Sequence, residues 1–102
     1  MIPPMGNFFD QAKKFQAELK DVQVSGESGA GMVKVSMDGR YYILDIEVDD
    51  EIYKEGKTIA IDLIKGAAVD AAAKVKQAVE DKMSDFASSF GLLKDKKVKG
   101  ES

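Results

Sequence analysis

Three carboxylates at alternating positions are the residues in this sequence whose types and spacing first suggest chemistry. Asp45, Glu47 and Asp49 would lie on one face of a β-strand, because successive side chains of a strand point to opposite faces. Carboxylates bind hard cations such as Mg²⁺ and Ca²⁺, and a carboxylate pair can do acid–base work. However, these three positions span about 13 Å of strand, and Asp50 stands where an EF-hand loop needs glycine. We therefore expect a solvated strand face without a metal or other cofactor.

The glycine-rich stretch GESGAG, Gly26 to Gly31, could be a phosphate-binding loop. Its glycines follow the order GxxGxG, whereas a P-loop needs GxxxxGK[ST] and a dinucleotide loop needs GxGxxG, and both of those open a helix. Here a strand pattern follows, so no helix N-terminus would be available to hold an anion. We expect a turn or bulge between two strands, and no small-molecule substrate.

Histidine and cysteine are both missing from the 102 residues. This excludes Ser-His-Asp and Cys-His sites, Cys-ligated zinc, iron–sulfur clusters and disulfides. We therefore expect a protein that is not an enzyme. No apolar run approaches the roughly 18 residues of a membrane span, and the start MIPPMGNFFD does not have the pattern of a secretory signal. The expectation is a cytoplasmic protein with no membrane partner.

Lysine is the remaining residue type with a chemical task, which is to bind phosphate. The chain has 15 basic and 18 acidic residues and a formal net charge of −3, and Arg40 is its only arginine. Nucleic-acid binding would therefore need lysines gathered on one surface. Lysine would contact the backbone as a point charge and would not read bases. For each lysine the alternative is an ordinary solvated helix face. The candidates are the lysines of two predicted helices and of the C-terminal tail: Lys13, Lys14, Lys20, Lys74, Lys76, Lys82, Lys94, Lys96, Lys97 and Lys99.

A predicted β-hairpin is the central element that would position these lysines. Apolar and polar residues alternate from Met32 to Met37, and Asp38-Gly39 is a strong signal for a two-residue type I′ turn. Such a turn would pair Val35 with Tyr42 and extend the second strand through Ile46. A further short strand is expected over Val22 to Ser25.

The hairpin should have a helix on its N-terminal side. Prolines in the first six residues indicate a lead-in, so the helix should begin near Asn7, a plausible N-cap. Apolar residues then recur at spacings of three and four, which is typical of a helix-packing seam. This seam would pack either on another helix, such as one of a second subunit, or on the chain's own sheet. Its members are Phe8, Ala12, Phe15, Leu19 and Val22.

A longer helix is predicted after the hairpin. The segment from Asp49 to Lys57 reads as a connector with room for a helical turn, and an α-periodic pattern then runs from Thr58 to Phe90. A helix of about 33 residues is about 50 Å long, so part of it must project from a three-stranded sheet or meet a second subunit. Its alanine-rich middle, GAAVDAAAKV, allows close approach of another backbone. The tail after it is expected to be flexible, either as a nucleic-acid contact or as a solvating segment.

One motif in this order of elements resembles a known family. SGESGAGMVKVSMDG, from Ser25 to Gly39, meets every defined position of the pattern [TS]-G-E-S-G-A-G-[LM]-V-x-V-x-x-[ND]-G, which is similar to the signature of the YbaB/EbfC family of nucleoid-associated proteins. The long helix extends the resemblance through LIKGAAVDA and departs from the family at Val69, where asparagine is usual.

The resemblance implies more than the residue patterns do. It implies a bacterial homodimer whose strands form the dimer core and whose helices project as arms. It also implies binding of double-stranded DNA with low sequence specificity and a change in DNA conformation. A location at the nucleoid, a role in nucleoid organisation and gene regulation, and no catalysis would follow. The motif positions are structural, so no DNA-contacting residue is carried over from the family.

The prediction is therefore an α+β fold: a helix, a three-stranded antiparallel sheet with the Asp38-Gly39 hairpin, and a long C-terminal helix, dimeric with projecting arms. Residues 1–91 would form one YbaB/EbfC-like domain, and residues 92–102 a flexible lysine-rich tail. The alternative function is a protein-interaction module that docks a partner protein through its helices without binding DNA. Residues expected in the dimer interface or core are Val33, Val35, Tyr42, Leu44, Ile46, Phe15 and Leu19.

Overall fold

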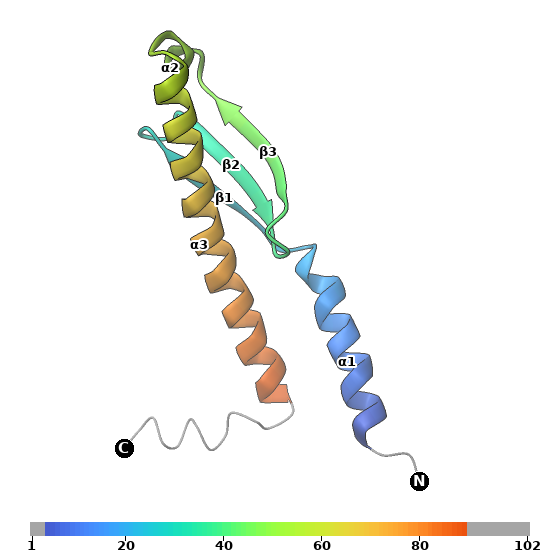
Figure 1. Ribbon diagram of the computed structural model, residues 1–102. Coiled ribbons are helices and arrows are strands. Elements are labelled where there is room, and N and C mark those ends of the chain that lie inside the picture. Colours follow the sequence, from blue (N-terminus) through green and yellow to red (C-terminus); the bar gives the residue numbers. More distant parts are fainter. Residues whose placement is uncertain (1–3, 90–102) are drawn as a thin grey trace, which may run out of the picture.

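The computed structural model describes residues 4–89, with side chains described for residues 8–88. Its elements are α1 (Pro4–Leu19), β1 (Gln23–Ser28), β2 (Val33–Asp38), β3 (Ile43–Val48), α2 (Asp50–Lys54) and α3 (Lys57–Ser89) (Figure 1). This order confirms the predicted α+β fold class. The predicted tail at residues 92–102 lies outside the described part of the chain.

Both long helices extend beyond one end of the sheet (Figure 1). The 33-residue α3 confirms the predicted long helix. The predicted start of the first helix was wrong, since α1 begins at Pro4 and not near Asn7. Proline is tolerated in the first turn because its missing N–H would have no intrahelical partner there. No helix in the described residues is long and apolar enough to cross a membrane.

The sheet is antiparallel, with β2 between β1 and β3. The predicted hairpin register was wrong, because Val35 pairs with Ile46 and not with Tyr42. The loop between β2 and β3 spans residues 39–42, so it is longer than the expected two-residue turn. The observed partner of Val35, Ile46, lies four residues beyond the predicted one. Because this shift is even, Ile46 lies on the sheet face that was predicted for it.

The Asp38 side chain organises this longer loop. It is 1% exposed, and its Oδ1 accepts hydrogen bonds from the backbone N–H groups of Arg40 at 2.7 Å and Tyr42 at 3.3 Å. Its Oδ2 pairs with the Arg40 guanidinium at 2.6 Å. These bonds hold four residues of loop around one carboxylate, and a type I′ turn would not make them.

Gly39 is needed for close approach and not for a positive φ angle. Its N–H donates to the Leu19 carbonyl at 3.0 Å, and a Cβ at this position would lie 2.4 Å from that oxygen. The left-handed residue of the loop is instead Tyr41, with φ of 68°. The end of α1 is therefore held directly against the loop of the β2–β3 hairpin.

The Asp38–Arg40 pair predicts a pH dependence of stability. The side-chain hydrogen bond from Arg40, together with backbone N–H donors, holds the pKa of Asp38 below its ordinary value of 3.8. Because the folded-state pKa is the lower one, the stabilisation is fully present above about pH 4 and is lost as the pH falls through the folded-state pKa. We expect Asp38→Asn to lower Tm clearly near neutral pH and by less near about pH 2.5, below the unfolded-state pKa. Thermal unfolding followed by circular dichroism checks this, with Asp45→Asn on exposed β3 as the control. Equal Tm losses at both pH values would contradict the assignment to the charged carboxylate.

The core lies between α3 and the inner face of β1 and β2. In this core the backbones of β1 and α3 cross very closely. A Cβ on Gly26 would lie 2.2 Å from the Ala71 nitrogen and 2.3 Å from the Ala67 carbonyl oxygen. The alanine-rich segment of α3 thus accepts a neighbouring backbone, that of β1. Gly26 was wrongly placed in a turn, because β1 runs through it and the turn follows at residues 29–32. The buried apolar residues are Val33, Val35, Met37, Ile52, Ala60, Ala67, Ala71 and Val75.

The third strand, β3, is an edge strand that α3 leaves largely uncovered (Figure 1). Tyr42, Leu44 and Ile46 are 43% to 58% exposed. Val33 and Val35, which were also expected in the dimer interface or core, are fully buried beneath α3. One edge of the sheet therefore presents apolar side chains to solvent in the isolated chain.

Candidate nucleic-acid interface

The first helix contacts the far end of α3, away from the sheet. The ring centroids of Phe15 and Phe86 are 5.4 Å apart, and those of Phe8 and Phe86 are 6.0 Å apart. The predicted seam on α1 therefore packs on a helix of its own chain and not on its own sheet. Phe15 and Leu19 of this seam are both partly buried.

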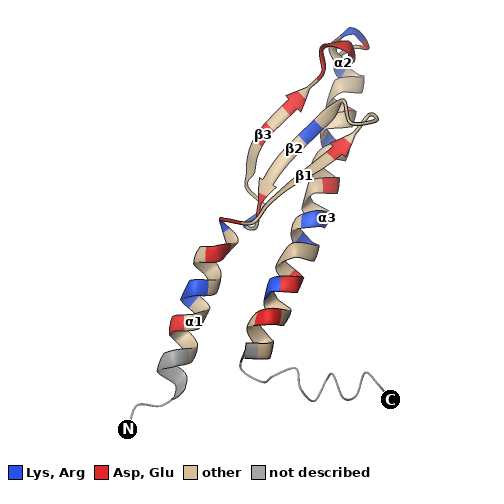
Figure 2. Ribbon diagram, turned by 180° about the vertical axis from the view of Figure 1, so that it is seen from behind, with Lys and Arg blue, Asp and Glu red and all other residues tan. Residues whose placement is uncertain are grey.

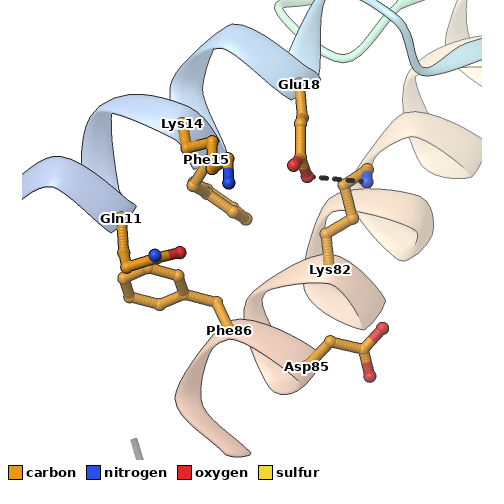
Figure 3. A pocket seen from close by; sticks show the side chains of 7 residues that line it. All are labelled: Gln11, Lys14, Phe15, Glu18, Lys82, Asp85 and Phe86. Atoms are coloured by element: carbon orange, nitrogen blue, oxygen red, sulfur yellow. Dashed lines mark hydrogen bonds and ion pairs between the residues drawn. The ribbon is translucent and has the colours of Figure 1, made fainter. Parts of the chain in front are cut away.

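An open groove of about 230 Å³ lies between the two helices (Figure 3). Its charges balance, since Lys14 and Lys82 stand with Glu18 and Asp85. Figure 3 shows Glu18 and Lys82 pointing toward one another, with Nζ and Oε1 3.3 Å apart. This inner surface carries no excess positive charge, so it is a poor site for a polyanion. The lining residues are Gln11, Lys14, Phe15, Glu18, Lys82, Asp85 and Phe86.

Lys74, another candidate from the sequence, ties α3 to the sheet. Its Nζ lies 3.2 Å from Oδ2 of Asp70 and donates to the Ser25 carbonyl at 2.9 Å. Asp70 also accepts the backbone N–H of Glu27 at 2.9 Å, and this bond, with help from Lys74, lowers the Asp70 pKa. Lys74 therefore has a structural task where α3 crosses β1.

Four candidate lysines remain exposed without an ion pair to any described residue. They are Lys13, Lys14 and Lys20 on or beside α1, and Lys76 on α3. Lys94, Lys96, Lys97 and Lys99 lie outside the described residues. Along α1 and α3, the two helical arms, basic and acidic positions are interspersed (Figure 2). Residues 4–89 hold eleven basic and sixteen acidic side chains. Any attraction for phosphate must therefore be local to particular helix faces.

The three carboxylates of the second hairpin strand do not come together as a site. Asp49 caps α2, since its Oδ1 accepts the backbone N–H of Glu51 at 2.9 Å. Asp45 and Glu47 are exposed on β3. Within the described residues no group of three or more acidic, histidine or cysteine side chains could hold a metal ion.

These features define an α+β protein whose unpaired candidate lysines, among the described residues, lie on or beside the two long helices. The chain belongs to the YbaB/EbfC DNA-binding family, whose sequence model matches residues 1–90. This confirms the resemblance seen in the signature motif.

Relatives agree with this assignment, and a solved structure has a similar fold. A nucleoid-associated protein of Coxiella burnetii is 39% identical over 94 residues, covering 85% of this chain and 86% of that protein. One of Hahella chejuensis is 40% identical over 95 residues, covering 86% and 88% respectively. The crystal structure of an uncharacterized Helicobacter pylori protein superposes with a TM-score of 0.59 at 25% identity, covering 86% of this chain and 99% of that one.

Proposed function

We propose that this protein is a nucleoid-associated protein that binds double-stranded DNA as a homodimer, with low sequence specificity, and alters the conformation of the DNA. Residues 1–91 would act as one domain at the nucleoid, by binding and not by catalysis. The family match over residues 1–90 carries this proposal, and relatives named nucleoid-associated proteins support it. No observation favours the alternative of a protein-docking module.

The charged side chains support backbone contact without base reading. Lysine binds phosphate as a point charge, whereas bidentate recognition of guanine usually needs arginine. Arg40, the only arginine, is paired with Asp38 and lies with its guanidinium carbon 4.3 Å from the Tyr42 ring centroid. Low sequence specificity follows from this set of side chains.

The exposed edge of the sheet supports the homodimer. An edge strand with apolar side chains and unpaired backbone groups invites pairing with another strand. Ile43, Leu44 and Ile46 are exposed apolar residues of the edge strand β3. A two-fold contact between two β3 strands would cover them, since such an interface uses the same patch on both copies. Both pairs of arms would then remain available to DNA.

Binding is expected to depend steeply on salt. With about four phosphate contacts per dimer, the affinity should fall roughly tenfold for each doubling of salt concentration. Fluorescence anisotropy of a labelled duplex of about 30 base pairs, titrated from about 20 mM to 200 mM salt, measures this. An unrelated duplex should compete about equally well. Absence of binding at about 20 mM salt and tens of micromolar protein would refute the proposed function.

A further inference from the structure

One arc on the side of α1 that faces away from α3 differs in composition from the rest of the helix, because it carries no carboxylate. At about 100° per residue, Phe9, Lys13 and Gln16 fall within an arc of about 60°, and Lys20 follows directly after the helix. All four are exposed. The acidic side chains of α1 lie outside this arc: Glu18 faces α3, and Asp10 is about a quarter turn away. We call Phe9, Lys13, Gln16 and Lys20 the outer face of α1.

Phe9 is the unusual member of this face. It is 57% exposed, and its ring meets that of neighbouring Phe8 edge-on, at 5.8 Å between centroids. Phe8 by contrast turns toward Phe86. Exposing a phenyl ring to water is unfavourable, and here the ring stands one helical turn from the Lys13 ammonium.

We propose that the outer face of α1 is the DNA-contact face, with Lys13 and Lys20 on phosphates and Phe9 inserted against a base-pair step. This rests on the proposed function and assigns its contact residues. The occupant follows from charge complementarity, since two lysines and an amide are gathered with no carboxylate among them. Apolar wedges beside basic residues partly unstack DNA and kink it, so Phe9 would supply the change in DNA conformation.

Two neighbouring lysines of α1 allow a direct test of this proposal. Lys13 lies on the outer face, whereas Lys14 lines the inner groove with Glu18 and Asp85. Seven residues, about 10.5 Å of helix, separate Lys13 from Lys20, so both could reach one DNA backbone. The groove side offers no comparable pair, because Lys82 is held by Glu18.

The first test compares Lys13→Gln with Lys14→Gln, which remove the same charge from adjacent positions. Lys13→Gln should weaken DNA binding roughly five- to tenfold at low salt and reduce the salt slope by about one per lost contact. Lys14→Gln should change the affinity less than about twofold. Equal losses, or a larger loss for Lys14→Gln, would overturn the outer face while leaving the proposed function standing. Absence of binding by the unaltered protein would instead refute the proposed function itself.

The second test addresses Phe9 through DNA shape. A duplex of about 30 base pairs carrying a dye at each end reports bending by energy transfer. The unaltered protein and Phe9→Leu should raise the transfer, whereas Phe9→Ala should bind within about threefold of normal affinity and raise it little. Circular dichroism and light scattering confirm that each variant is folded and of unchanged mass. Bending by Phe9→Ala equal to that of the unaltered protein would overturn the wedge, as would loss of the dimer, which would place Phe9 in a subunit contact.

Discussion

Replacing Gly26 with alanine is expected to destabilise the fold by about 3 kcal/mol or more. The added methyl carbon would lie 2.2 Å from the Ala71 nitrogen and 2.3 Å from the Ala67 carbonyl oxygen. Both are backbone atoms of one continuous helix, so no side-chain rotation can relieve the clash. The helix α3 would have to lift from β1, which would open the core around Val35, the residue paired with Gly26.

Urea unfolding followed by circular dichroism measures this effect. The matched control is Gly66→Ala on α3, because a Cβ there would meet the Ser28 Cβ at an ordinary 3.6 Å. That variant should be neutral or more stable by up to about 1 kcal/mol, since alanine favours helix over glycine. A Gly26→Ala protein whose unfolding free energy stays within about 1 kcal/mol of normal would show that α3 and β1 do not approach so closely.

Ile46→Glu is expected to convert the dimer to monomers. Ile46 is 43% exposed in the single chain, so a glutamate is tolerable for folding. In a β3–β3 interface it would bury two unpaired carboxylates near the two-fold axis. We expect the dimer to weaken by at least about a hundredfold, because an uncompensated buried charge costs several kcal/mol.

Light scattering after size-exclusion chromatography should show a mass near 11.1 kDa for Ile46→Glu and about twice that for the unaltered protein. Val69→Glu introduces the same charge on α3, where Val69 is 70% exposed, and should remain dimeric. An Ile46→Glu protein that stays dimeric would move the interface away from β3. If DNA binding requires both pairs of arms, the monomer should also bind DNA far more weakly.

Local periodicity was enough to predict the elements and their order. Spacings of three and four residues marked α1 and the 33-residue α3, and strict alternation marked β2. The motif from Ser25 to Gly39 was enough to indicate the family. These features depend on residues close together in the chain, so a sequence read in short windows contains them.

The lysines show where local patterns stop being informative. Lys13 and Lys14 look equivalent in a list of charges, and only the packing of α1 on α3 shows that Lys14 lines the groove while Lys13 does not. Lys82 looked available, yet its partner Glu18 is 64 residues away in the chain. Such pairings depend on where the fold brings distant segments, and no local pattern encodes them.

Tertiary contacts likewise decided the backbone details. The Asp38 carboxylate extends the β2–β3 loop and shifts the register, although Asp38-Gly39 by itself favours a two-residue turn. Gly26 looked like a turn residue, but it lies in β1, where glycine is needed because the backbone of α3 passes directly over it. The charged and apolar residues were thus predictable as types from the sequence, while their partners and the faces they occupy followed from the packing of α3 on one small sheet and of α1 on the far end of α3.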